Sequence, residues 1–229
     1  TSVTLVLGVA TGGFAADTIK LGVAGPHSGD LAPYGIPAMK AAQLVVKKIN
    51  ATGGVLGKQV ELLIQDDQCK PEIATNTATK LVTEGADVVL GHICSGATKA
   101  ALGIYKDAKV PVMSPSATNP PLTQSGDYPN FFRTIASDDM QAKMAVDFAI
   151  NTLGVKKIAV LHDKGDYGKG FAEFAKKFIE AVVGREHFIP VSQVILAELA
   201  GEIALLASAG VERVCVYPRL RVAIISTGD

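Results

Sequence analysis

The stretch VVLGHICSGATKAA, residues 88–101, joins an apolar run to an alanine-rich run through a short polar turn. The apolar part is typical of a buried strand, and the alanine-rich part is typical of a helix. His92, Cys94 and Ser95 stand at the turn between the two parts. A turn of this kind suits three different roles: a nucleophile, half of a disulfide, or a cradle for a small anion.

The strand-to-helix unit recurs on both sides of this stretch. Apolar runs predict strands at 18–25, 59–67, 86–93, 110–116 and 156–163, and helical periodicity predicts helices at 36–50, from Pro71 onward, and at 96–109, 140–154 and 167–182. This alternation predicts an α/β protein whose mostly parallel sheets carry helices on both faces. The pattern restarts near 134–138 after the irregular loop 117–130, so we expect one lobe at 17–137 and a second, partial lobe at 138–183.

The composition excludes some classes of partner and indicates a compartment. Lys and Arg together number 22 and Asp and Glu also number 22, so the net charge favours neither nucleic acid nor an anionic membrane. Residues 1–16, TSVTLVLGVATGGFAA, are apolar and rich in small side chains. They are typical of the end of a secretory signal, which predicts export; a buried first strand is the alternative.

The chain has three cysteines, Cys69, Cys94 and Cys215, and their spacing fits neither a zinc site nor a C-x-x-C redox pair. Cys69 and Cys94 follow neighbouring predicted strands and lie at the same edge of the sheet, where a disulfide is reasonable. Closing a loop of about 25 residues would contribute roughly 3 kcal/mol to the stability. The alternative is a pair of free buried thiols, and Cys215 has no assigned partner.

Small hydroxyl residues follow two of the predicted strands. Ser95 precedes a helix, and Ser116, Ala117 and Thr118 follow VPVM, residues 110–113, at the end of the next strand. Ligands of α/β proteins bind at the carboxyl ends of strands, where helix N-termini favour anions. We therefore expect these residues to bind a carboxylate. The ordinary alternatives are a helix N-cap for Ser95 and a turn residue for Thr118.

Other polar motifs give weaker indications. A nucleophile at His92, Cys94 or Ser95 is disfavoured because no residue nearby in the sequence orients His92, so a structurally satisfied histidine is the better interpretation. The glycines of GVAGPHSG have the wrong spacing for a dinucleotide. HDKGDYGKG could indicate metal or acid–base chemistry or simply a solvated turn, and its useful residue is Tyr167, which could stack on a ligand. No metal and no cofactor is expected.

Six blocks in collinear order carry a family resemblance: IKLGVAGPHSGDLAPYG, ELLIQDDQCKPEIA, VLGHICSGAT, SPSATNPPLT, FFRTIASDDMQ and IAVLHDKGDYGKG. Over about 17–181 the chain resembles the leucine/isoleucine/valine-binding proteins of bacterial ABC importers, of the periplasmic-binding-protein type I fold.

The resemblance implies two lobes, joined by three crossovers, that close on an amino acid, and a disulfide between Cys69 and Cys94. It implies that the Ser95 and Thr118 hydroxyls and the backbone of Ser116 hold the ligand's charged groups on the first lobe. Tyr34 and Tyr167 would contact the ligand from either side of the cleft.

The segment 184–229 differs from that pattern. Its ALLASAGV and RVAIISTGD motifs resemble a fragment of the molybdopterin molybdenumtransferases, which would make it a divergent, possibly chimeric tail. The alternative is a helix and strand that complete the second lobe. Because the rest of that lobe is not in the sequence, we expect the chain itself to bind amino acid weakly or not at all.

The sequence thus predicts a monomeric periplasmic solute-binding protein, not an enzyme, that delivers a leucine-, isoleucine- or valine-like amino acid to a membrane permease. One alternative is a sensor domain of the same fold for another small acid or amide. The other is a molybdenum-cofactor enzyme fragment in the tail.

Overall fold

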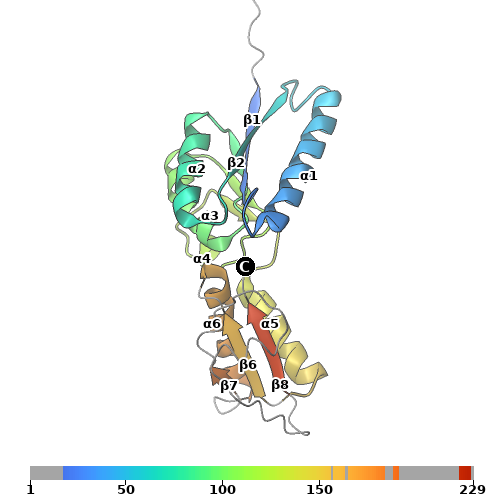
Figure 1. Ribbon diagram of the computed structural model, residues 1–229, viewed down its shortest axis with the longest axis vertical. Helices are drawn as coiled ribbons and strands as arrows, with labels where there is room; N and C mark the ends of the chain where they lie inside the picture. The colour runs from blue at the N-terminus through green and yellow to red at the C-terminus, as the bar shows by residue number, and fades with distance from the viewer. Residues whose placement is uncertain (1–17, 156, 163–164, 184–187, 191–221, 228–229) are drawn as a thin grey trace, which may run out of the picture.

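The computed structural model describes residues 18–155, 157–162, 165–183, 188–190 and 222–227. These residues form two parallel sheets, each with its own helices, that follow one another along the long axis of the molecule (Figure 1). The expected α/β class with parallel sheets is therefore confirmed. Residues 1–16 and Cys215 lie outside the described residues.

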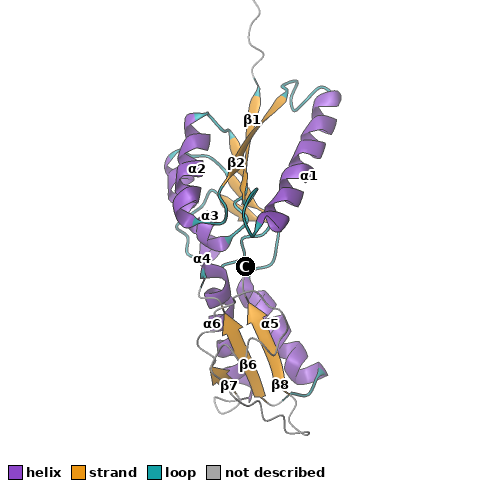
Figure 2. Ribbon diagram, viewed as in Figure 1, coloured by secondary structure: helices purple, strands orange, loops and turns teal. Residues whose placement is uncertain are grey.

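The strands of the first sheet, in orange in Figure 2 with β1 and β2 labelled, have the order β2-β1-β3-β4-β5, and all their pairs are parallel. Its strands are β1 (Ile19–Gly25), β2 (Val60–Asp66), β3 (Val88–Leu90), β4 (Val112–Ser114) and β5 (Phe131–Arg133). Because the strands are parallel, their carboxyl ends lie at one edge of the sheet, where the polar turns gather.

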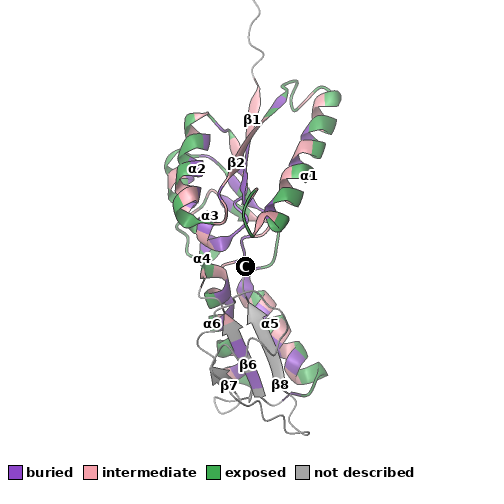
Figure 3. Cartoon of the chain, viewed as in Figure 1, coloured by how far each residue is buried: buried purple, intermediate pink, exposed green. Residues whose placement is uncertain are grey.

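Helices flank this sheet. Figure 1 shows α1 (Ala32–Ala51) on one side and α2 (Pro71–Thr83) and α3 (Ser95–Asp107) on the other. The α2 and α3 faces enclose a core with the sheet, and the buried part of that core is visible in Figure 3. Its fully inaccessible side chains include Leu81, Val89, Leu102, Tyr105 and Val112.

The second sheet has β6 (Lys157–His162) between β7 (Phe188–Pro190) and β8 (Val222–Thr227), all parallel. Helices α5 (Asp138–Asp147), its π-helical continuation η1 (Phe148–Thr152) and α6 (Asp166–Val183) cover it. A separate core lies between the helices and β6 and includes Val146, Ile158, Ala175 and Ile179.

Helix α1 and the loop after β4 differ from the expectation. Helix α1 begins at Ala32 rather than at residue 36, because Pro33 in its first turn has no N–H to satisfy and a φ that suits a helix. The loop at 117–130 contains a short helix, α4 (Pro121–Gln124), which also starts at a proline.

Two features are absent from the described part of the chain. None of its helices combines the length and apolar character that a membrane span requires. Within the same residues, no group of three or more His, Cys, Asp or Glu side chains is placed to hold a metal ion.

Candidate ligand-binding site

A cavity of about 280 Å³ lies at the carboxyl edge of the first sheet and receives side chains from both lobes. Among the described residues, ten line it: Leu31, Tyr34, Ile93, Cys94, Ser95, Ser116, Thr118, Ile135, Gln141 and Tyr167. Five of the six expected ligand-binding residues are among them. The sixth, Ala117, is fully buried in the core of the first lobe instead. A volume of this size is at the small end of ligand sites.

Ser95 presents its hydroxyl group to this cavity from the first turn of α3. The N-cap interpretation of Ser95 is wrong, since the N-cap is Cys94 and Ser95 is already helical. The Ser95 Oγ accepts the N–H groups of Thr118 and Asn119, each at 3.2 Å. With both lone pairs used, the hydroxyl hydrogen is the group that Ser95 can offer to a ligand.

The loop that carries Ser116 and Thr118 is tied down by Ser114 at the end of β4. The Ser114 Oγ accepts the N–H groups of Ser116, at 3.2 Å, and Ala117, at 2.9 Å. The Ser116 N–H is therefore already bonded within the chain, while Ser116 itself lines the cavity. Thr118, which is almost fully buried, brings a further hydroxyl group to the wall, beside Ser95 and Ser116.

The electrostatics at this wall favour an anion. The first helical hydrogen bond of α3 runs from the Thr98 N–H to the Cys94 carbonyl, so the N–H groups of residues 95–97 lie at the open end of the helix. The first turn has no acidic residue, and the helix dipole adds a partial positive charge there. Among the described lining residues none is Asp, Glu, Lys or Arg. A carboxylate is the group that this wall would bind best.

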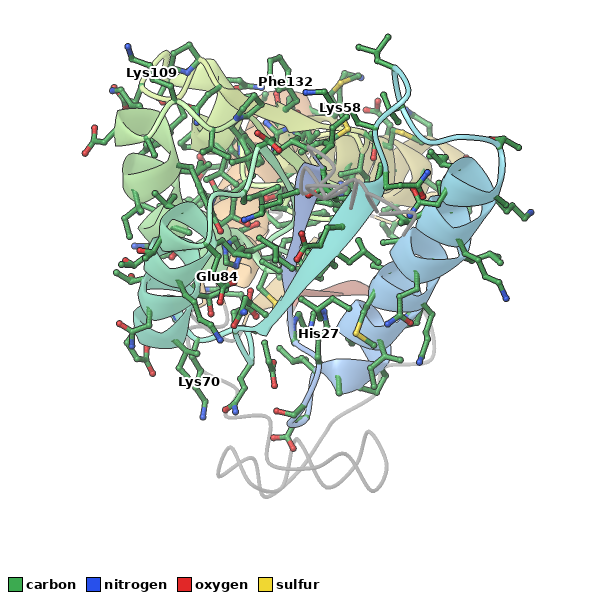
Figure 4. All side chains as sticks on the ribbon, turned by 90° about the horizontal axis from the view of Figure 1, so that it is seen from above. His27, Lys58, Lys70, Glu84, Lys109 and Phe132 are labelled. Atoms are coloured by element: carbon green, nitrogen blue, oxygen red, sulfur yellow. A yellow bond between two sulfur atoms is a disulfide. The ribbon has the colours of Figure 1, made fainter. Side chains whose placement is uncertain are left out.

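The turn from β1 to α1, which leads to Leu31 and Tyr34, is held by Asp66 at the end of β2; Figure 4 labels His27 in this turn. Burial favours the neutral carboxyl group of Asp66. The Ser28 hydroxyl and the N–H groups of His27, Gln68 and Ser28 all donate to it and outweigh burial, so the pKa of Asp66 lies below its usual value. Asp66 thus fixes this wall most strongly when ionised.

The opposite wall comes from the second lobe. Tyr167 stands in the first turn of α6, and its ring packs edge-on against Phe171. The neighbouring Asp166 joins the lobes: its carbonyl accepts the Asn119 Nδ2–H at 2.8 Å, and its carboxylate lies 3.6 Å from the Lys99 Nζ. These contacts place Tyr167 over the cavity.

The disulfide between Cys69 and Cys94 is confirmed, with 5.5 Å between the Cα atoms, so the alternative of two free thiols is wrong. It links the loop after β2 to the residue that precedes Ser95. The stretch 88–101 is therefore both half of a disulfide and the start of the candidate anion cradle.

His92 is structurally satisfied, as expected. It is fully buried, with its Nδ1 at 2.5 Å from the Asp67 Oδ2 and its Nε2 at 3.1 Å from the Tyr105 hydroxyl. No residue nearby in the sequence orients His92, but Asp67 and Tyr105 do so in the fold. Both partners are distant in the sequence, which is why the local pattern did not reveal them.

The sequence also missed apolar residues of the cavity, namely Leu31, Ile93 and Ile135, and the polar Gln141. Their closeness in the sequence to expected site residues or to the family blocks could have identified them. Ile93 precedes the Cys94–Ser95 pair, and Ile135 and Gln141 flank the start of α5 within one of the six family blocks.

The amino-acid sequence of this chain is similar to those of known amino acid-binding proteins. A leucine-, isoleucine-, valine-, threonine- and alanine-binding protein of Pseudomonas aeruginosa is 44% identical over 175 residues, which are 76% of this chain and 47% of the relative. The Leu/Ile/Val-binding protein of Escherichia coli K12 is 38% identical over 157 residues, 69% of this chain and 42% of the relative. The chain thus spans about half the length of the curated relatives it matches.

Solved structures agree with this result. The branched-chain amino acid transporter substrate-binding protein LivJ of Streptococcus pneumoniae, in complex with isoleucine, superposes with a TM-score of 0.72 at 34% identity. The match covers 85% of this chain and 54% of that structure.

The comparisons with known proteins also bear on the tail at 184–229. They give no support to its resemblance to molybdopterin molybdenumtransferases. A Leu/Ile/Val-binding protein homologue of Brucella abortus matches 91% of the chain at 34% identity, and β8 within the tail pairs with β6 of the second lobe. The family model for periplasmic binding proteins matches residues 18–214, and this chain belongs to that family.

Proposed function

We propose that the chain is a substrate-binding component of an ABC transporter for branched-chain or other aliphatic amino acids. It works in the periplasm as a monomer, without catalysis, and delivers its ligand to a membrane permease. The observation that carries this proposal is the cavity wall at the start of α3. There the Ser95, Ser116 and Thr118 groups meet the helix N-terminus.

The rest of the cavity suits an aliphatic side chain. Leu31, Ile93 and Ile135 surround the polar wall, and Tyr34 and Tyr167 add rings from the two lobes. A ligand with a carboxylate at the helix start would place its apolar part against these side chains, where removal from water stabilises it. The relatives named for leucine, isoleucine and valine have ligands of this chemistry.

An NMR titration of the full chain with L-leucine tests the proposal, because it detects binding even when the affinity is only millimolar. We expect the amide signals of Ser95, Ser116 and Thr118 to shift in a saturable way. Ser95→Ala should weaken binding about tenfold, the loss expected for one hydrogen bond to a charged group. Saturable binding whose shifts lie away from this wall, or Ser95→Ala with unchanged affinity, would contradict the proposal.

A second candidate is the uptake or sensing of another carboxylic acid. A solute-binding protein of R. palustris, 27% identical with a TM-score of 0.70, was solved in complex with benzoate. The described lining residues here include no acidic side chain for an ammonium group, which agrees with such a ligand. Titrations with benzoate and with 4-methylpentanoate, which is leucine without its ammonium group, separate the two. Binding of either acid more tightly than leucine would favour the second candidate.

A further inference from the structure

A buried chain of hydrogen bonds runs beneath the candidate site and is not part of the cavity. Asp67 directly follows β2, His92 lies in the segment after β3, and Tyr105 stands in the last turn of α3; all three are inaccessible to solvent. With the His92 Nδ1–H donating to Asp67, the Nε2 is the acceptor for the Tyr105 hydroxyl. Burial, and next the nearby charge of Asp67, raises the pKa of Tyr105, so this hydroxyl keeps its proton.

The main chain of His92 connects this group of side chains to the ligand-binding loop. The His92 carbonyl accepts the Ser114 hydroxyl at 2.5 Å. The same Ser114 oxygen accepts the N–H groups of Ser116 and Ala117. Since β3 ends at Leu90, His92 lies beyond the described ladder of that strand, and its side chain ties this segment to Asp67 and Tyr105 in the interior.

We propose that His92, held between Asp67 and Tyr105, is a positioning residue for ligand binding: it fixes the carbonyl to which Ser114 binds, and through Ser114 it sets the position of Ser116 and Ala117, which precede Thr118. The expected effect on the affinity for an amino acid rests on the proposed function. The positioning itself is a property of the unliganded chain and can be measured there.

Amide hydrogen exchange of Ser116 and Ala117 in the full chain measures how firmly the loop is held. Tyr105→Phe keeps the ring and removes one hydroxyl group, so it should raise exchange at these two amides about fivefold, as expected for one neutral hydrogen bond. Asn50→Ala is the matched control. It removes side-chain hydrogen bonds to Val60 at the opposite edge of the sheet and should lower the melting temperature without affecting the loop.

A double-mutant cycle then tests whether the effect passes through Ser114. Ser114→Ala should raise the same exchange rates about tenfold, and Tyr105→Phe should add almost nothing on that background because the link is already broken. If Tyr105→Phe destabilises the protein as Asn50→Ala does but leaves the Ser116 and Ala117 exchange unchanged, the positioning role is wrong. Additive effects of the two substitutions would also contradict it.

Leucine titration of the same variants adds the functional readout. We expect Tyr105→Phe to weaken binding about fivefold and Asn50→Ala to leave it unchanged. A native chain that binds no leucine would contradict the proposed function, while the exchange measurements would still decide on the positioning role. Normal affinity in Tyr105→Phe together with faster loop exchange would show that the loop position does not limit binding, and would overturn the inference.

Discussion

Single hydrogen-bonding side chains at the strand ends decide how the loops around the cavity are held. Asp66 is the clearest case, because it accepts the N–H groups of His27 and Gln68 and the hydroxyl of Ser28. A carboxyl group whose pKa is lowered on folding stabilises the protein above its unfolded pKa, and this stability is lost as the pH falls through the folded pKa. Acid should therefore loosen the turn that leads to Tyr34.

Asp66→Asn tests this at the residue scale. At neutral pH the melting temperature should fall by about 4 °C, the shift expected for roughly 1 kcal/mol. Below a pH of about 4 the difference in melting temperature between the variant and the native chain should shrink, since Asp66 then takes up a proton on unfolding. Thermal unfolding between pH 7 and 3 measures it, with Asp30→Asn, exposed in the same turn, as the control. A constant difference across this range would contradict the role of the Asp66 charge.

At the scale of elements, helix α2 depends on one buried face against the sheet and α3. Leu81 is fully inaccessible, and its removal leaves a cavity in the core. Leu81→Ala should lower the free energy of unfolding by about 3 kcal/mol in denaturant titrations. Leu44 on α1 is 56% exposed, so Leu44→Ala should cost well under half of that. Equal losses would show that the packing of α2 is not what stabilises this lobe.

The Cys69–Cys94 disulfide acts between two elements, the loop before α2 and the start of α3. It closes a loop with a sequence separation of 25. Reduction should lower the free energy of unfolding by about 3 kcal/mol, mainly because the unfolded chain gains freedom. Denaturant unfolding with and without a reductant measures this, and the double variant Cys69→Ala/Cys94→Ala should no longer respond to the reductant. A stability independent of the reductant in the native chain would contradict the prediction.

At the scale of the whole molecule, the two lobes approach each other closely where α6 faces the loop after β4. A Cβ atom at Gly170 would lie 2.9 Å from the Asn119 Nδ2, which itself donates to Asp166. Gly170→Ala should therefore displace the Asn119 side chain, break its hydrogen bond to the Asp166 carbonyl and weaken leucine binding several-fold in titrations. Gly103→Ala in α3 is the control, since a Cβ there meets no atom within 4 Å. Unchanged affinity in Gly170→Ala would show that this contact does not govern the approach of the lobes.

The sequence by itself determined the strand-to-helix alternation and thus the class of fold. Strands buried on both faces need continuous apolar runs, and each run between two turns is visible locally. The same locality revealed Ser95, Ser116 and Thr118, because residues that follow parallel strands necessarily share one edge of the sheet.

Only the tertiary structure decided what those residues do with their polar groups. Ser95 looked like a helix cap in its local sequence, yet its oxygen accepts N–H groups more than 20 residues away. His92 has partners 25 and 13 residues distant, which no pattern of neighbours encodes. The physical reason is that a hydrogen bond depends on positions within a few tenths of an ångström. Such positions are set by the packing of whole elements and not by the periodicity that places a residue on a strand or helix.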